Sequence, residues 1–443
     1  MATTVVFLNL RRSPLEAASA LFAAHRLGME VALVADRPPP FSERLLRRLE
    51  LVDTYDRALA LEAVCRVAAQ VSAAGIVTWA DRDVELAAAA AARLDLPGPD
   101  PAAARRARNK YEMRLAVAAQ RPDLVPRFER VTSEAELRTA AGQIGFPAVL
   151  KPAGASGSKG ILELDSAEQF RPACELLLAL ARPEADRQFV DYPGELVYEE
   201  RLGGSEHSVD GLVFDGDIHG AAITDKWTTT PYHVEYREIH PSALAPEHQA
   251  QLHELTEAVV SALALDFCAF HLECRLLPDG SAKLLEIAAR IGGGYIASHL
   301  IPMSTGVPFY EDVLRVACGE RPREALRRTG VKAGGRSLVS DRAGMLAGVD
   351  GIDRILALPG LELFAWDAAI GSHIGLPPEE FANSTIASVI ARGATDHEVL
   401  RSLEQAAAIA EFRLVDGDGV PAVGRDAVAR QDEPAQVGEV VAG

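Results

Sequence analysis

The sequence lacks most features that mark secreted, membrane or nucleic-acid-binding proteins. Its five cysteines are scattered, odd in number and free of Cys-x-x-Cys spacing, which favours reduced, buried thiols and a cytoplasmic protein. No apolar run reaches about 18 residues, so no transmembrane helix is predicted. The first basic residues follow an apolar run instead of preceding it, unlike a signal peptide. The 45 basic residues are outnumbered by 63 acidic ones, which argues against a nucleic acid or an anionic membrane as partner.

Two common phosphate-binding fingerprints are also missing. The stretch KPAGASGSKG, residues 151–160, is rich in glycine, serine and lysine, yet Ser158 follows Gly157 where a Walker A loop needs lysine. It is flanked by the β-prone runs FPAVLK and ILEL, so it does not open into a helix as a dinucleotide loop would. The pattern predicts a β-hairpin whose glycine tip can close over phosphates. The alternative is an ordinary glycine-serine hairpin tip at the surface.

The first 108 residues alternate between strand and helix patterns. Such a βαβ series predicts a parallel sheet. No glycine fingerprint follows the first strand, so we expect a scaffold and part of a substrate wall instead of a dinucleotide site. The expected strands are 5–10, 30–36 and 76–81, and the expected helices are 14–28, 61–75 and 84–98.

The rest of the 443-residue chain divides into two further domains and a tail. Residues 109–320 are rich in strand patterns, interrupted by predicted helices at 110–120, 133–145 and about 247–263. Residues 321–430 form an α+β region with a predicted helix at 396–412, and residues 431–443 lack periodicity and are expected to be flexible. The fold class is thus α/β and α+β, in several domains.

The stretch HLECRLLPDGSAKLLEIAAR places two carboxylates by means of a turn. Pro278-Asp279-Gly280 is a turn signal between two β-like runs. If the turn is centred between Asp279 and Gly280, Glu273 lies opposite Glu286. Facing carboxylates repel each other unless a cation lies between them, and Mg²⁺ prefers such oxygen ligands. The alternatives are a solvated hairpin face or a register slip of one residue, which would break the pairing.

A second group of glutamates lies in VYEERLGGSEHSVDG. Glu199 and Glu206 flank a glycine pair at 203–204. A short strand followed by a turn can offer backbone amides to an adenine edge and a carboxylate to ribose hydroxyl groups. A charged, exposed strand end explains the same residues equally well.

In their order along the chain, these pieces resemble the ATP-grasp superfamily from Asn109 to about Pro308. The resemblance implies an ATP-grasp fold of two subdomains behind a Rossmann-like N-terminal domain, with ATP and Mg²⁺ as cofactors and Mn²⁺ able to substitute. It implies phosphate contacts from Lys110 and Lys151 under the glycine loop 154–160, adenine and ribose contacts from the glutamate segment, and one or two metal ions on Glu273 and Glu286. The cofactor residues so implied are Lys110, Lys151, Gly154, Ser156, Gly157, Ser158, Gly160, Glu199, Glu200, Leu202 and Glu206.

One departure refines the resemblance. Many members carry Glu-x-Asn-x-Arg at the second metal position, whereas this chain reads EIAAR, with Ala288 in place of the asparagine. This form, followed by glycines, resembles the L-amino acid ligases that make dipeptides. It implies Arg290, Lys151 and Lys159 as catalytic residues, and Arg290, Gly293, His271 and Trp227 near the substrate. Arg290 could instead pair with Glu286 or another acid at a strand end.

The resemblance implies an ATP-dependent carboxylate–amine ligase. It would join an amino acid to an amine or a second amino acid through an acyl phosphate, with release of ADP and phosphate. The partners would be small carboxylates and amines, and a homodimer is left open. Two other functions remain as alternatives: a carboxylase of the same fold that activates bicarbonate, and an ATP-binding regulator without turnover.

Overall fold

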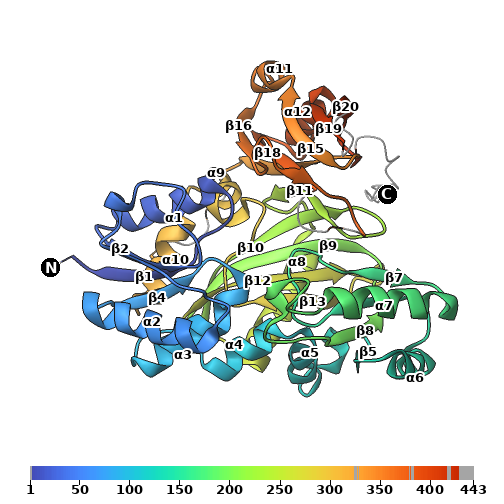
Figure 1. The fold of residues 1–443 in the computed structure, drawn as a ribbon, viewed down its shortest axis with the longest axis horizontal. Coiled ribbons are helices and arrows are strands. Elements are labelled where there is room, and N and C mark those ends of the chain that lie inside the picture. The colour runs from blue at the N-terminus through green and yellow to red at the C-terminus, as the bar shows by residue number, and fades with distance from the viewer. Residues whose placement is uncertain are drawn as a thin grey trace.

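A computed structural model describes residues 2–323, 327, 329–378, 380, 384–416 and 421–428, so the predicted flexible tail lies outside the described residues. The chain begins with a four-stranded parallel sheet in the order β3-β2-β1-β4. This confirms the parallel sheet predicted from the alternating pattern, with β3 as an unpredicted edge strand (Figure 1). Its elements are β1 (Thr4–Leu8), α1 (Pro14–Arg26), β2 (Glu30–Ala35), β3 (Arg48–Leu51), α2 (Arg57–Val71), β4 (Gly75–Thr78) and α3 (Val84–Arg93).

The second sheet is small and antiparallel, in the order β5-β8-β6-β7. β6 and β7 pair with each other, which confirms the predicted hairpin with the glycine loop at its tip. Helix α6 begins after Ser133, whose hydroxyl accepts a hydrogen bond from the Glu136 amide at 3.3 Å, as the capping pattern predicts. The elements here are α4 (Pro101–Arg108), α5 (Lys110–Ala118), β5 (Phe128–Val131), α6 (Glu134–Ile144), β6 (Ala148–Pro152), β7 (Leu162–Leu164), α7 (Phe170–Leu180) and β8 (Leu196–Glu200).

The third sheet has eight strands in the order β13-β12-β9-β10-β11-β14-β18-β16. It runs across residue 320 without a break, because β11 pairs with β14. The first part of this sheet and its helices comprise β9 (Ser205–Phe214), β10 (Asp217–Thr228), β11 (Glu235–His240), α8 (Pro246–Leu263), β12 (Cys268–Leu276), β13 (Ala282–Ala288), the π-helix Ile296–Leu300, α9 (Ile301–Thr305) and α10 (Phe309–Ala317).

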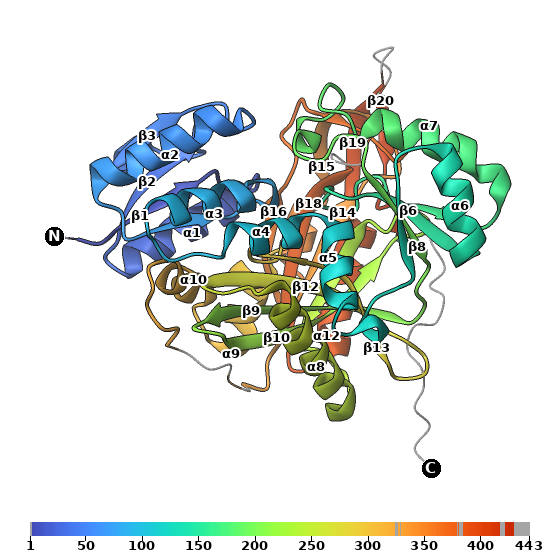
Figure 2. The same ribbon diagram turned by 90° about the horizontal axis from the view of Figure 1, so that it is seen from below.

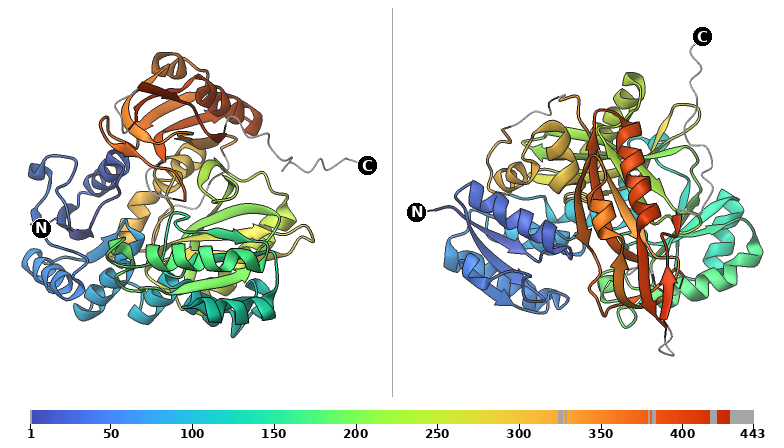
Figure 3. Two further views of the ribbon diagram at one scale, coloured as in Figure 1. Left: turned by 45° about the vertical axis from the view of Figure 1, so that its right-hand side comes forward. Right: turned by 90° about the horizontal axis from the view of Figure 1, so that it is seen from above.

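The C-terminal part adds strands to this sheet and builds a further small sheet in the order β17-β15-β19-β20. Helix α12 lies along β14 and β18, as both panels of Figure 3 show. The elements are β14 (Lys332–Val339), β15 (Gly344–Asp350), α11 (Ile352–Leu356), β16 (Leu361–Trp366), β17 (His373–Ile374), β18 (Thr385–Gly393), α12 (Asp396–Ile409), β19 (Glu411–Val415) and β20 (Pro421–Gly424).

The hairpin β12–β13 has the predicted pairing at its functional position. Glu273 lies opposite Glu286. Nearer the turn, however, Cys274 pairs with Leu284, so the register shifts by one residue between Glu273 and Cys274. The turn is therefore not centred where the sequence placed it, and a β-bulge restores the predicted pairing.

Helix α10 joins the N-terminal sheet to the eight-stranded sheet. All nine of its residues are buried, and it packs against α1, β4 and β12 (Figure 2). This packing fixes the carboxyl ends of β1, β2 and β4 beside β12 and β13. Among the described residues, no helix is both long enough and apolar enough to cross a membrane.

Candidate active site

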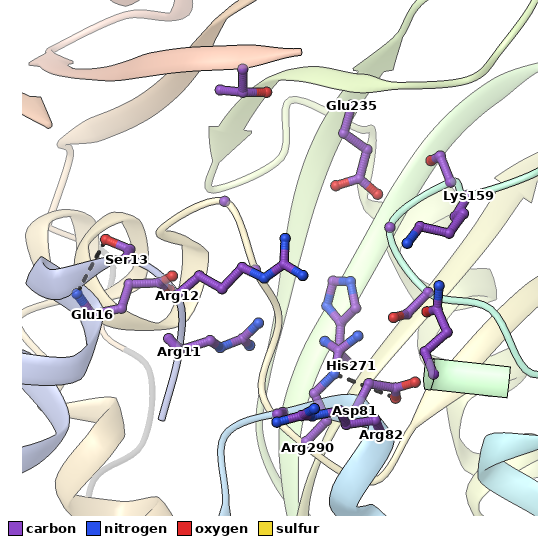
Figure 4. A pocket seen from close by; sticks show the side chains of 18 of the residues that line it. Arg11, Arg12, Ser13, Glu16, Asp81, Arg82, Lys159, Glu235, His271 and Arg290 are labelled. Atoms are coloured by element: carbon purple, nitrogen blue, oxygen red, sulfur yellow. Dashed lines mark hydrogen bonds and ion pairs between the residues drawn. The ribbon is translucent and has the colours of Figure 1, made fainter. Parts of the chain in front are cut away.

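A cavity of about 770 Å³ opens where the three sheets meet. Its walls come from the loops after β1, β2 and β4, from the glycine loop, and from β11, β12 and β13. Arg12 and Lys159 point into it from opposite sides, with His271 between them (Figure 4). Ligand sites of open α/β sheets commonly lie at the carboxyl ends of the strands, which is where this cavity lies.

The tip of the glycine loop adopts a backbone that favours glycine. Gly157, Ser158 and Gly160 have φ angles of +67°, +56° and +75°. Ser158 donates a hydrogen bond from Oγ to the carbonyl oxygen of His233 at 2.6 Å, on the turn between β10 and β11. The loop thus lies across the cavity and contacts its far side.

The predicted cofactor residues of this loop divide into two groups. A Cβ atom at Gly154 would lie 2.7 Å from Cδ2 of Tyr192, and one at Gly160 would lie 2.9 Å from Cδ2 of Leu180, so these glycines serve close packing. Neither of them lines the cavity. The loop residues that do line it are Ser156, Gly157, Ser158 and Lys159.

Two of the predicted lysines connect the loop to its surroundings. Lys159 lines the cavity and forms an ion pair with Asp186. Lys110, at the start of α5, is buried, with its Nζ 2.7 Å from Oε2 of Glu286. It also donates a hydrogen bond to the carbonyl oxygen of Ala155, so one ammonium group links the glycine loop to β13.

Lys151 and the residues predicted to hold adenine form a buried network outside the cavity lining. Lys151 pairs with Glu199, which also accepts a hydrogen bond from Nε of Arg114 at 2.8 Å. Burial lowers the pKa of Lys151, and although burial opposes it, the charges of Arg114 and Lys151 lower the pKa of Glu199. Glu200 pairs with Arg127 and Lys283 at its exposed edge. The carboxylates of Glu199 and Glu200 are therefore engaged by cations, and an adenine contact stays a prediction only for the backbone that continues to Leu202.

Carboxylates converge at the floor of the cavity, which Glu235 and Glu273 line and Glu206 does not. One oxygen each of Glu206, Glu235 and Glu273 lies within 4.8 Å of the others. Lys226 Nζ lies 2.5 Å from both Glu235 Oε1 and Glu273 Oε1, while Glu206 pairs with Arg275 at 2.7 Å. Burial, opposed by Lys226 and assisted by the Glu273 charge, raises the pKa of Glu235 to about 7. The sequence predicted Glu206 at ribose and did not single out Glu235 or Lys226.

The predicted metal pair fits a divalent cation chemically. Glu273 and Glu286 are carboxylates on neighbouring strands, and each has a lysine ammonium group, Lys226 or Lys110, as its present counter-charge. Oxygen donors of this kind suit Mg²⁺, which is bound by one or two carboxylates together with phosphate oxygens. Ala288 lies opposite His271 and offers no ligand atom of its own.

His271 and Arg290 lie beside the metal pair and line the cavity. His271 bonds Asp210 Oδ1 through Nδ1 at 2.9 Å and Glu273 Oε1 through Nε2 at 3.1 Å. Burial opposes the charged ring, but Asp210 outweighs it and raises the pKa of His271 to about 9. Arg290 lies 3.6 Å from Asp81 and donates to the Ile291 carbonyl, so its acidic partner is Asp81 and not Glu286.

Two residues predicted near the substrate have different outcomes. Gly293 lines the cavity. Trp227 does not, because its ring packs under the guanidinium of Arg237, 4.4 Å from ring centroid to Cζ, on the side of the C-terminal strands. The cavity thus gives no support to Trp227 near the substrate, and that contact stays a prediction.

Comparison with known proteins identifies the fold. An ATP-grasp domain matches residues 144–298, an ATP-grasp N-terminal domain matches 21–98, and L-amino acid ligase C-terminal domain 2 matches 336–415. The chain has the ATP-grasp fold. The crystal structure of L-amino acid ligase from Bacillus licheniformis shares this fold, with a TM-score of 0.79 and 20% identity over 93% of this chain and 98% of that one.

Curated relatives of the chain include named ligases. Alanine–anticapsin ligase of Bacillus subtilis is 29% identical over 274 residues, which are 58% of this chain and 57% of the relative. Carnosine synthase 1 of Gallus gallus is 29% identical over 288 residues, which are 62% of this chain and 31% of the relative. The chain thus spans somewhat more than half of the first relative and about a third of the second.

The structure adds cavity residues that sequence reasoning missed. Most belong to the N-terminal sheet, and a signal for them existed, since each follows a predicted parallel strand and such loops share one edge. Arg11 of this group binds the carbonyl oxygens of Ile291 and Gly292 at 2.7 Å each, and so ties the N-terminal sheet to the glycine segment after β13. The additional residues are Arg11, Arg12, Ser13, Glu16, Asp36, Arg37, Asp81, Arg82, Glu235 and Asp367.

Proposed function

We propose that this protein is an ATP-dependent carboxylate–amine ligase that joins an amino acid to an amine or a second amino acid. The observation that carries the proposal is the facing pair Glu273 and Glu286 at a cavity that the glycine loop covers. A carboxylate-rich floor below a cationic loop suits a phosphate chain and its metal. The named relatives and the matched L-amino acid ligase C-terminal domain favour the same reaction class.

The proposed cofactor residues follow from this arrangement. Glu273 and Glu286 would hold one or two Mg²⁺ ions, with Mn²⁺ able to substitute, and Glu206 would face the ribose. When bound, the metal supplies positive charge that stabilises the transferring phosphoryl group. Lys110 and Lys151 would contact the phosphates, each released in part from the carboxylate that it pairs with.

The chain's own groups would assist the chemistry in three ways. Lys159 and Arg290 supply cationic donors where charge develops on the phosphoryl group and the substrate carboxylate. His271, held between Asp210 and Glu273, would position the Glu273 carboxylate at the floor. The loop contact between Ser158 and His233 closes the cavity, and this would protect a reactive acyl phosphate from water. An amine then attacks the acyl carbon and phosphate leaves.

The experiment is release of ADP measured against panels of amino acids and amines, with and without bicarbonate, with products identified by mass spectrometry. We expect ADP, phosphate and an amide in equal amounts. Stoichiometric AMP would exclude the acyl-phosphate route. Turnover only with bicarbonate would favour a carboxylase, and ATP binding without turnover in any panel would favour a regulator.

A further inference from the structure

A second chamber of about 490 Å³ adjoins the catalytic cavity between α1 and the loop after β16. Its floor and far wall are small or polar, with Ala368, Ala369 and Ser372 among them. The two chambers share one boundary, so a ligand in the second chamber can reach the first. The shared residues are Arg12, Ser13, Glu16, Gly294, Asp367 and Thr385.

Glu16 is an unsatisfied anionic group at this boundary. It lies in the first turn of α1 and is 7% exposed, yet Oε1 has no hydrogen-bond partner. A buried carboxylate oxygen without a partner is costly, which indicates a group that is completed by a ligand. Asp367 lies across the boundary, with Oδ1 accepting from the Tyr295 hydroxyl at 2.8 Å and Oδ2 from Ser388 at 2.6 Å.

Arg12 is an unpaired cation at the same boundary. Within the described part of the chain its guanidinium makes no hydrogen bond or ion pair, although Glu16 is only four residues away. In Figure 4 it extends into the catalytic cavity on the side of Glu16. The neighbouring Arg11 is engaged by backbone carbonyl groups, so Arg12 is the guanidinium of this pair that can receive an anion.

We propose that this boundary binds the amine-bearing substrate as a zwitterionic amino acid, with its carboxylate on Arg12 and its ammonium group on Glu16. The inference rests on the proposed ligase function and names the class of its second substrate. A simple amine would leave Arg12 without a counter-charge, and a simple acid would leave Glu16 unsatisfied, whereas an amino acid pairs with both. The methyl-sized and hydroxyl side chains of the second chamber leave room for its side chain.

The position of Glu16 suits it for proton transfer as well as binding. Glu16 and Arg290 line the same catalytic cavity. The ammonium group gives one proton to the Glu16 carboxylate, and the free amine attacks the acyl carbon. A C–N bond forms, the bond from the acyl carbon to the phosphate oxygen breaks, and the departing phosphate takes the second amine proton. Glu16 then returns its proton to water.

The charged groups around Glu16 set its protonation. Burial raises the pKa of Glu16, Arg11 and Arg290 oppose this, and Asp367 assists it. The other titratable groups that face it are Arg12 on the preceding loop, and Tyr295 and Tyr310, whose own pKa values are raised mainly by burial, with the Glu16 charge as a further cause. Glu16 is thus a carboxylate that can hold a proton closer to neutral pH than an exposed glutamate can.

The first test is Arg12→Gln, assayed with each of the twenty protein amino acids as acceptor and with the amine that lacks its carboxylate. We expect the KM for the amino acid to rise about tenfold or more, because a charge-assisted hydrogen bond is lost. The KM for the matched amine should rise much less, because that amine has no carboxylate to lose. Arg44→Gln, an exposed arginine of the same N-terminal region, is the control. Equal loss with both acceptors, or no loss, would overturn the assignment to Arg12.

The second test is Glu16→Gln, with Glu43→Gln as control. We expect kcat to fall and the acidic limb of the kcat–pH profile to disappear, while Glu16→Asp restores part of both. A pH profile of unchanged shape in Glu16→Gln would overturn the proton-transfer role.

Calorimetry separates this inference from the proposed function. Amino acids are titrated into the wild type and Arg12→Gln in the presence of ADP and Mg²⁺. Binding that only the wild type shows supports the site even if no amide forms. Amide formation with unchanged binding in Arg12→Gln refutes the site and leaves the ligase function standing. Absence of both binding and turnover refutes both proposals.

Discussion

Two buried clusters are built from similar charged residues, but one has more cations than carboxylates and the other has more carboxylates than cations. The lid cluster, on the small sheet and α5, consists of Arg114, Lys151 and Glu199, with two cations for one carboxylate. The floor cluster, on the eight-stranded sheet, consists of Glu206, Glu235, Glu273 and Lys226, with three carboxylates around one lysine and a further arginine at the edge. The lid is thus electropositive and the floor electronegative.

The pKa shifts in each cluster reflect its surplus of positive or negative charge. In the lid, burial lowers the pKa of Lys151, whereas the charges of Arg114 and Lys151 outweigh burial and lower the pKa of Glu199. In the floor, Glu235 takes the opposite shift, to about 7. The surplus of cations in the lid therefore favours the phosphate oxygens of the proposed cofactor. The surplus of carboxylates in the floor favours the proposed metal cation. Substitutions in the two clusters should accordingly act on different quantities.

The largest effect is expected from Glu199→Gln in the lid. It leaves Arg114 and Lys151 buried side by side without a counter-charge, and breaking a buried ion pair from one side costs about 3–5 kcal/mol. Urea denaturation should show this loss in the free energy of unfolding. The control is Glu257→Gln, on the exposed face of α8. A loss below about 1 kcal/mol would show that the lid cluster is held by other contacts.

The second effect concerns the floor and is kinetic. Glu286→Gln should lower kcat by at least about a hundredfold, as expected for damage to a metal site, while the protein stays folded. Its stability should fall less than that of Glu199→Gln, because buried Lys110 loses its carboxylate partner but keeps its hydrogen bond to the Ala155 carbonyl, and the repulsion with Glu273 is relieved. Steady-state kinetics at millimolar Mg²⁺ and a melting curve measure the two quantities. Normal turnover would mean that Glu286 serves only to pair with Lys110.

A smaller kinetic effect is expected at Arg290, at the edge of the floor. Lysine keeps the charge but loses the bidentate fork, so Arg290→Lys should lower kcat/KM about tenfold or more, with ATP affinity nearly unchanged. Competition with a fluorescent ATP analogue measures that affinity. Near-normal kcat/KM would make Arg290 a structural partner of Asp81, which lies 3.6 Å away.

Sequence reasoning reached what depends on local order along the chain. The parallel sheet, the glycine hairpin and the pairing of Glu273 with Glu286 follow from strand patterns and turns, and the structure confirms them. The pairing also shows a limit, since the turn was centred wrongly and a bulge at Leu285, opposite the step from Glu273 to Cys274, compensated for it. A pattern of period two cannot reveal a single inserted residue.

Ion pairs and facing charges between residues far apart in the chain could not be predicted from the sequence. Lys226 meets Glu273 because β10 and β12 flank β9, and Glu16 faces Asp367 across some 350 residues of chain. The adenine contact of Glu199 stays a prediction, and the sequence did not reveal that its buried carboxylate is paired with Arg114 and Lys151. These pairings depend on strand order and on the burial of the charged groups, which residue type alone does not reveal.

The smallest effect is expected from Glu238 on β11, which extends the floor cluster and tests its charge surplus through pH. Glu238 is 2% exposed, and burial, with the nearby charge of Glu235, raises its pKa to about 8 from an ordinary 4.5. The folded protein therefore keeps a proton that the unfolded chain releases, so stability falls as pH rises from 4.5 to 8 and changes no further above that.

Glutamine cannot ionise, so Glu238→Gln should melt a few degrees higher than the wild type at pH 8.5 and at the same temperature at pH 4.5. The melts are recorded without Mg²⁺ or nucleotide, since a bound cation would itself favour the charged carboxylate. A gain of the same size at both pH values would show that packing, and not the ionisation of Glu238, causes the effect. Glu238 would then not count toward the surplus of carboxylates in the floor cluster.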